Sequence, residues 1–461
     1  MKLRKQSPDG LKIIIVGCGK VGATLTEQLS REGHDITLVD LDATTVEILS
    51  NTYDVMGLVG NGASYSVQQE AGVENADLII AVTGSDELNL LCCTVARKVG
   101  NCATIARVRN PDYTEELSYL REQLGLSMII NPDMEAATEM ARILRLPTAL
   151  DIDSFAKGGA ELIKFRIPQG NKLHEKTIAS AAQILSCGAL FCVVERGHAL
   201  SIPSGNFVLR EGDLVSVLVS AKDIRSFFSS IGVETHQVSS AMTIGGGRTS
   251  YYLARQLLDM GIRVKIIERD RQRCEELSTL LPKATILHGD GTDEQLLQEE
   301  GLARTESFIP ITGLDEENIL MTLYARRISE CKVITKLNRV SFRDVVAQLD
   351  LGSIVYPRYI TAEAIIAYVR ARQNSIGSNI ETLYYLFDNR VEAAEFCVEE
   401  NAPVIGIPLA ELSLKNNLLI ACINRGGQII IPRGNDHIEA GDTVIVVTTH
   451  TGFHDIRDIL R

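Results

Sequence analysis

Short runs of β-branched apolar residues alternate along this chain with segments whose apolar positions recur at helical spacing. Residues 12–16 form one such run, residues 21–30 carry the helical spacing, and residues 36–39 form the next run. The runs predict buried strands, and the segment between them predicts an amphipathic helix. Because parallel strands need a crossover connection, the order strand, helix, strand predicts a parallel sheet covered by helices.

The same pattern occurs twice. Residues 17–22 fall on residues 245–250 at an offset of 228, and Thr83 falls on Thr312 at an offset of 229. Self-similarity at an almost constant offset indicates an internal duplication. We therefore expect two copies of one structural unit.

Each predicted Rossmann-like half ends in a helical stretch, at residues 134–146 and 362–372, and a segment of different character follows. Residues 160–220 alternate short β-rich runs with glycine turns, which predicts a small α+β module. The predicted fold class is α/β, with two Rossmann-like doubly wound domains that are each followed by such a module. The expected boundaries are 11–132 and 238–357 for the Rossmann-like domains, and 152–234 and 377–461 for the modules.

Composition narrows the class of protein further. The chain has 461 residues with 45% hydrophobic and 23% charged residues, and no apolar stretch approaches the ~20 residues that a membrane span requires. The basic start is followed only by a short strand-like run, so we expect a soluble protein that is not exported. A net charge of −13 argues against binding to nucleic acid or directly to anionic lipid. A role at the membrane would require a protein partner.

The ten cysteines are scattered and form no Cys-x-x-Cys pair. Without an export signal, this pattern predicts buried thiols rather than disulfides or a zinc site. We therefore expect no metal centre.

The first glycine loop has the spacing of a dinucleotide-binding turn between strand and helix. Gly17 permits the tight turn, Gly19 lets the backbone approach a pyrophosphate, and Gly22 lets the helix pack close to the strand. Asp40 ends the next predicted strand, where a carboxylate accepts hydrogen bonds from ribose hydroxyls and repels a 2′-phosphate. The loop therefore predicts a ribonucleotide and disfavours NADP. The alternative is a Rossmann unit that keeps these glycines only for packing.

The second loop repeats this logic with one departure. Ser250 takes the place of the third glycine, while Glu268 keeps the ribose carboxylate. Arg248 matches Lys20, so both loops present a cation beside the expected phosphates, although either side chain could simply be solvated.

Further candidates follow other predicted strands, at the sheet edge where ligands bind to doubly wound folds. Arg107 could meet a phosphate bidentately or form a structural salt bridge, and Lys336 occupies its place in the second copy. The predicted nucleotide-binding residues are Gly17, Cys18, Gly19, Lys20, Val21, Gly22, Asp40, Asn61, Thr83, Gly84 and Arg107 in the first copy, and Gly245, Gly246, Gly247, Arg248, Thr249, Glu268, Asp290, Thr312 and Lys336 in the second.

The doubled order of glycine loop, ribose carboxylate, Thr83 with Asn89, and a module that ends in Glu211-Gly212-Asp213 resembles the tandem RCK (KTN) family, the domains that regulate potassium conductance. The resemblance covers nearly the whole chain. It implies a regulatory subunit that binds NAD(H), ATP or ADP. It also implies that copies of the chain assemble as a ring-shaped homo-oligomer, which we expect to be a tetramer. It also implies a TrkH-like membrane potassium transporter as partner, and a cytoplasmic location at the inner face of the membrane.

Two other functions remain open from the sequence alone. An NAD-dependent oxidoreductase would need an acid or base near the nicotinamide, and the nearest histidine, His288, has Val59 at its position in the first copy. A scaffold that binds no nucleotide is the second alternative. We expect a regulator with no catalytic residue, and the sequence does not rank NAD(H), ATP and ADP.

Overall fold

The computed structural model describes residues 10–114, 116–197, 199–233, 235–338, 346, 349–374, 380–387, 390–450, 453 and 455–461. The chain divides into two compact units. The first contains residues 1–141 and 239–366, and the second contains residues 142–238 and 367–461. The expected domain limits at Glu234 and Gly377 lie outside the described residues.

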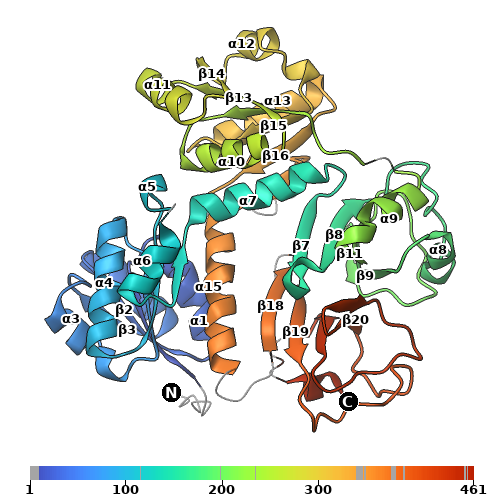
Figure 1. Cartoon of the computed structure of the whole chain (residues 1–461), viewed down its shortest axis with the longest axis horizontal. Coiled ribbons are helices and arrows are strands. Elements are labelled where there is room, and N and C mark those ends of the chain that lie inside the picture. Colours follow the sequence, from blue (N-terminus) through green and yellow to red (C-terminus); the bar gives the residue numbers. More distant parts are fainter. Residues whose placement is uncertain are drawn as a thin grey trace. The chain divides into compact units, whose positions relative to one another are not determined.

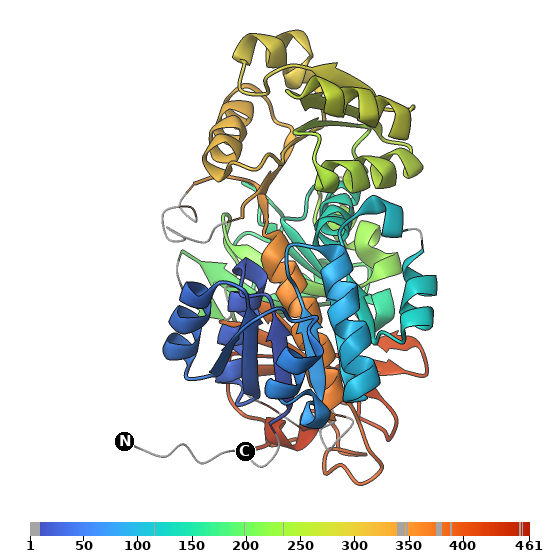
Figure 2. The ribbon, with the colours of Figure 1, turned by 90° about the vertical axis from the view of Figure 1, so that its left-hand side faces the viewer.

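The first copy contains a six-stranded parallel sheet in the order β3-β2-β1-β4-β5-β6. Figures 1 and 2 draw most of this copy in blue, with helices packed beside its strands. The strand order reverses between β1 and β4, which creates the crevice where doubly wound sheets bind ligands. Its elements are β1 (Lys12–Val16), α1 (Lys20–Arg31), β2 (Asp35–Asp40), α2 (Ala43–Tyr53), β3 (Met56–Val59), α3 (Tyr65–Glu70), β4 (Leu78–Ala81), α4 (Asp86–Val99), β5 (Ala103–Arg107), α5 (Pro111–Thr114), α6 (Leu117–Leu124), β6 (Met128–Ile130) and α7 (Pro132–Arg145).

The second copy repeats this topology in the sheet β14-β13-β12-β15-β16-β17. Its elements are β12 (Ser240–Ile244), α10 (Arg248–Asp259), β13 (Arg263–Glu268), α11 (Arg271–Leu280), β14 (Thr285–His288), α12 (Glu294–Glu299), β15 (Ser307–Pro310), α13 (Asp315–Ile328), β16 (Lys332–Lys336), β17 (Ser353–Val355) and α15 (Pro357–Asn374). Both long helices begin earlier than the sequence indicated, because a proline occupies the first helical position of each.

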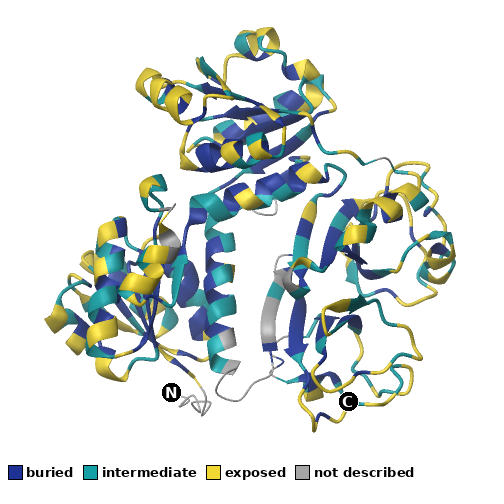
Figure 3. Ribbon diagram, in the orientation of Figure 1, coloured by how far each residue is buried: buried dark blue, intermediate teal, exposed yellow. Residues whose placement is uncertain are grey.

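The central strands are buried on both faces because helices cover both sides of each sheet, whereas the edge strands β3 and β14 are partly exposed. Ile13, Ile14 and Ile15 of β1 are at most 2% exposed, and Leu25 and Leu29 of α1 are fully buried. Figure 3 shows this contrast between dark blue strands and the yellow outer faces of helices.

The modules each contain a five-stranded antiparallel sheet, β10-β9-β11-β8-β7 and β18-β19-β22-β20-β21. Side chains of both sheets form one shared core, in which the Phe155 and Tyr384 rings lie edge to face with centroids 4.4 Å apart. Their elements are β7 (Asp151–Phe155), β8 (Ala160–Arg166), α8 (Ile178–Ile184), β9 (Ala189–Arg196), β10 (Ala199–Ser201), β11 (Leu214–Ser220), α9 (Ile224–Ser230), β18 (Ile380–Leu386), β19 (Val391–Cys397), β20 (Leu418–Arg425), β21 (Gln428–Ile430) and β22 (Thr443–Thr448).

The ten cysteines are free thiols, eight of them buried. Within the described residues, no group of three or more histidines, cysteines or carboxylates is placed to hold a metal ion. None of the described helices has both the length and the apolar character that crossing a bilayer demands.

A buried aspartate closes the last turn of each module. Asp213 accepts the Arg196 Nε–H at 2.7 Å and the Arg210 backbone N–H at 2.8 Å, and Asp442 holds Arg425 in the same way. Burial alone would raise the pKa of Asp213, but the hydrogen bonds from Arg196 and Arg210 outweigh it and lower the pKa.

We expect Asp213→Asn to lower the free energy of unfolding by about 2 kcal/mol at pH 7, because the Arg196 guanidinium loses its charged acceptor. The lowered pKa means that the wild-type contribution is complete above an unfolded pKa of about 4 and disappears as the pH falls through the folded value. Urea unfolding midpoints of the two proteins should therefore converge as the pH falls from about 5 toward the lowered folded pKa. A constant difference across that range would contradict the role of the carboxylate. Asp442→Asn should lower the free energy of unfolding at pH 7 by a similar amount.

Candidate nucleotide-binding site

A pocket of 620 Å³ lies at the carboxyl ends of the first copy's central strands. The nine predicted residues that line it are Gly17, Gly19, Lys20, Val21, Asp40, Asn61, Thr83, Gly84 and Arg107. Cys18 and Gly22 are not among its lining residues. Residues that the sequence did not indicate also line it: Ser85, Arg109 and Asp133 from the first copy, and Asn338, Pro357 and Arg358 from the second.

The glycines of the first loop have three different roles. Gly17 has φ +104°, a conformation that other residues rarely adopt. A Cβ on Gly22 would lie 1.9 Å from the Gly17 carbonyl oxygen, so helix α1 can approach the turn only without a side chain there. A Cβ on Gly19 would meet no atom within 4 Å, which leaves its backbone accessible from the pocket.

Asp40 connects the end of β2 to the glycine turn. One carboxylate oxygen accepts the Cys18 backbone N–H at 2.5 Å, and the other accepts the Asp42 backbone N–H at 3.0 Å. The side chain also lines the pocket, so its remaining lone pairs suit ribose hydroxyls. Burial, followed by the Asp40 charge, raises the pKa of the Cys18 thiol to about 12, so Cys18 contributes to the site through its backbone.

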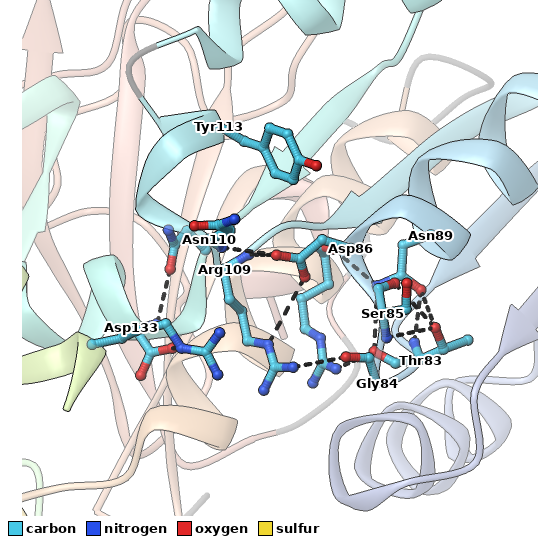
Figure 4. A network of polar contacts seen from close by, with 12 residues as sticks. Thr83, Gly84, Ser85, Asp86, Asn89, Arg109, Asn110, Tyr113 and Asp133 are labelled. Carbon is cyan, nitrogen blue, oxygen red and sulfur yellow. Dashed lines mark hydrogen bonds and ion pairs between the residues drawn. The ribbon is translucent and has the colours of Figure 1, made fainter. Parts of the chain in front are cut away.

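Asn89, which lies in the first turns of α4, holds the loop after β4 in place (Figure 4). Its Oδ1 accepts the backbone N–H of Thr83 at 2.8 Å and the hydroxyl of the same residue at 2.7 Å. Its Nδ2 donates to the Thr83 carbonyl at 3.3 Å and to the Arg107 carbonyl at 2.9 Å. The fully buried amide thus joins the ends of β4 and β5.

Asp86 makes a second connection beside this loop (Figure 4). Its carboxylate accepts the backbone N–H groups of Arg109 and Asn110, both at 2.8 Å, and the Arg109 guanidinium donates to the Gly84 carbonyl at 2.9 Å. The sequence carried a signal for Asp86 and Asn89, because Asp315 and Asn318 recur at the same offset and form the matching bonds.

Arg107 donates to the Thr83 carbonyl and, within the described residues, forms no ion pair. Burial and the neighbouring Arg109 charge lower its pKa to about 10. A cation that is desolvated beside another cation favours an anionic ligand. Arg107 therefore forms no structural salt bridge with any of the described residues.

The second copy's loop repeats the backbone geometry. Gly245 has φ +99°, and Glu268 accepts the Gly246 backbone N–H at 2.5 Å. A Cβ on Gly246 would lie 2.6 Å from a Leu277 methyl carbon, so this loop packs closely against α11. The other predicted residues take comparable places: Gly247 is open like Gly19, Thr312 is held by Asn318, Asp290 accepts the Thr292 N–H, and Lys336 ends β16.

Ser250 is accommodated by a second difference between the copies. Ser250 is 1% exposed, and its hydroxyl lies 3.4 Å from that of Thr243, which stands where the first copy has Ile15. The smaller, polar neighbour provides both space and a hydrogen-bonding partner for the added side chain.

Asp133 of the first copy also contacts the second loop. Its Oδ1 accepts the Thr249 hydroxyl at 2.7 Å, and its Oδ2 lies 3.6 Å from the Arg248 Nε. Burial lowers the pKa of Lys336, while the charges of Asp133 and Asp315 oppose that shift. The cation of the second loop therefore already has a carboxylate beside it.

The fold and this site define a class of protein, the tandem Rossmann-like domains that each carry a small companion module. The sequence matches the TrkA-N domain at residues 13–132 and 241–357, and the TrkA-C domain at residues 162–232 and 393–461. The chain therefore belongs to the TrkA family, which confirms the resemblance to tandem regulatory domains.

Relatives match over nearly the full length. The Trk system potassium uptake protein TrkA homolog 1 of Methanosarcina mazei is 30% identical over 98% of this chain and 100% of its own length. The Trk system potassium uptake protein TrkA of Halomonas elongata is 30% identical over 98% of each chain. The GsuK channel structure covers 96% of this chain and 78% of its own, with a TM-score of 0.63 and 20% identity, which supports the fold.

Proposed function

We propose that this chain is a nucleotide-sensing regulatory subunit that gates a membrane potassium transporter. The observation that carries the proposal is the pocket of the first copy, where an accessible glycine turn, a ribose carboxylate and several cations line one cavity. The relatives are described as proteins of the Trk potassium uptake system, which supports the transporter partner. Nucleotide binding would favour one arrangement of the assembled subunits, and that difference in affinity would bias the transporter.

The ligand classes that the pocket suits are NAD(H), ATP and ADP. Structures of the fold neighbour GsuK are described as bound to NAD and to ADP. The lining cations suit phosphate binding, and the small residues around Thr83 suit a close approach of the ligand. No observation in the described pocket favours hydride transfer, so we propose a regulator rather than an NAD-dependent oxidoreductase.

We propose that the second loop binds nucleotide more weakly than the first. Asp133 already lies against Arg248 and Thr249, so an incoming phosphate would have to compete with a carboxylate.

We further propose a cytoplasmic tetramer attached to the inner face of the membrane through a TrkH-like transporter subunit. Sedimentation of the purified chain would measure the oligomeric state.

Asp40→Ala is expected to weaken binding of NADH, ADP and ATP about tenfold or more, because the ribose loses its acceptor and the Cys18 N–H loses its partner. Calorimetric titration of the full-length chain measures the affinities. Asp35→Ala is the matched control, since Asp35 lies exposed at the other end of the same strand. Equal affinities in wild type and Asp40→Ala would exclude the assigned site.

A further inference from the structure

The helices that follow the two parallel sheets begin with opposite charges. Helix α7 begins Pro132-Asp133, whereas α15 begins Pro357-Arg358, and both pairs come directly after the last strand and one intervening residue. Because a proline occupies the first position of each helix, Asp133 and Arg358 occupy equivalent second positions. The duplication therefore kept the geometry and reversed the charge.

Each of these two side chains lies at the loop or the pocket of the other copy. Asp133 accepts the Thr249 hydroxyl and lies beside Arg248, so the first copy supplies an anion to the second copy's loop. Arg358 lines the first copy's pocket, so the second copy supplies a cation to the nucleotide site. Asp133 also lines the first copy's pocket, so that pocket contains both side chains, whereas the second loop is contacted by the carboxylate.

Arg358 lacks a polar partner among the described residues. Its Nε is shielded from solvent and has no hydrogen-bond acceptor. The guanidinium carbon lies 5.2 Å from the centroid of the Tyr359 ring, a cation–π contact that supplies no hydrogen-bond acceptor to Nε. A desolvated donor without an acceptor is costly, so a ligand that supplies an acceptor there gains affinity.

We propose that Arg358 binds the terminal phosphate of a nucleoside di- or triphosphate held in the first copy's pocket. Asp40 holds the ribose, and the glycine turn holds the phosphate that is attached to the ribose. A terminal phosphate has three free oxygens and up to two negative charges, which suit a guanidinium fork. Each phosphate of NAD(H) carries only one charge, because it is bonded both to a nucleoside and to the other phosphate. Arg358 therefore discriminates ADP and ATP from NAD(H) and AMP. This inference rests on the proposed nucleotide-binding function.

The test is calorimetric titration of the full-length chain with ATP, ADP, AMP and NADH. Arg358→Gln is expected to weaken ATP and ADP binding about tenfold and to leave AMP and NADH within about twofold. Arg358→Lys, which keeps the charge but loses the fork, is expected to lie between wild type and Arg358→Gln. Arg263→Gln is the control, because Arg263 is an exposed arginine of the same copy at the start of β13.

The outcomes separate this inference from the function on which it rests. If Asp40→Ala weakens all nucleotides while Arg358→Gln leaves ADP and ATP unchanged, the role of Arg358 is overturned and nucleotide binding stands. An equal loss of affinity for all four ligands in Arg358→Gln would show that Arg358 shapes the pocket without recognising a phosphate. That result would also overturn the proposed role of Arg358. If the wild-type chain binds none of the four, both proposals fail. Unliganded melting temperatures establish that each variant is folded.

Discussion

Gly22→Ser is expected to weaken nucleotide binding by the first copy about a hundredfold or more and to lower the free energy of unfolding by about 2 kcal/mol. The added Cβ would lie 1.9 Å from the Gly17 carbonyl oxygen, and the Ile15 methyl group is only 3.7 Å away. Helix α1 must therefore move away from the turn. The backbone N–H groups that would hold the phosphates move with it, so binding suffers more than stability.

Ser250→Gly is the matched variant in the second copy. Ser250 already coexists with its own turn because Thr243 replaces the bulkier isoleucine, and the two hydroxyls lie 3.4 Å apart. We expect Ser250→Gly to lower the free energy of unfolding by about 1 kcal/mol, because glycine is unfavourable within a helix. Nucleotide affinity should be unchanged. Thermal melting and ADP titration measure both quantities. Wild-type ADP affinity in Gly22→Ser would show that the first loop does not hold the phosphates.

Asn89→Asp is expected to lower the free energy of unfolding by about 3–5 kcal/mol at pH 7. The fully buried amide donates to the carbonyl oxygens of Thr83 and Arg107, and a carboxylate there would face both acceptors with no proton to share. Burial would raise the pKa of the new acid, so its penalty should shrink as the pH falls and the group becomes protonated. Urea unfolding at pH 7 and pH 5 measures the difference.

Asn318→Asp provides the comparison, since Asn318 makes the same four contacts with Thr312 and Lys336. We expect a similar loss of stability from both variants. At temperatures where both remain folded, only Asn89→Asp should weaken ADP binding, because Thr83 lines the proposed nucleotide pocket. Equal weakening of ADP binding by both variants would contradict a primary site in the first copy.

Much of the fold could be predicted because its signals are local. The β-branched run of β1, the glycine turn at Gly17 and the helical spacing of α1 each depend on neighbouring residues, and repetition of the pattern made the duplication certain. The parallel sheets and the module sheets followed from these signals. The predicted site residues stay a prediction until binding is measured, although the structure gathers nine of them around one pocket.

The roles of individual side chains depended on contacts that no local pattern encodes. Cys18 contributes only its backbone to the turn, and Asn89 joins two strand ends through four hydrogen bonds. A sequence shows that an asparagine follows a strand, but the atoms it meets depend on the register of α4 against β5. The recurrence of that asparagine in the second copy was the signal that could have singled it out.

The sequence by itself determined the duplication, the order of strands and helices, and the glycine turns, because these follow from residue spacing and from backbone conformations that glycine permits. Only the tertiary structure decided that Asp133 lies against the second loop and that Arg358 lines the first pocket. Their equivalence was hidden because the segment between the last two strands, from Arg107 to Met128 in the first copy and from Lys336 to Ser353 in the second, differs in length. The physical reason is that a charge acts on whatever lies within a few ångströms of it, and folding, not sequence spacing, brings those groups together.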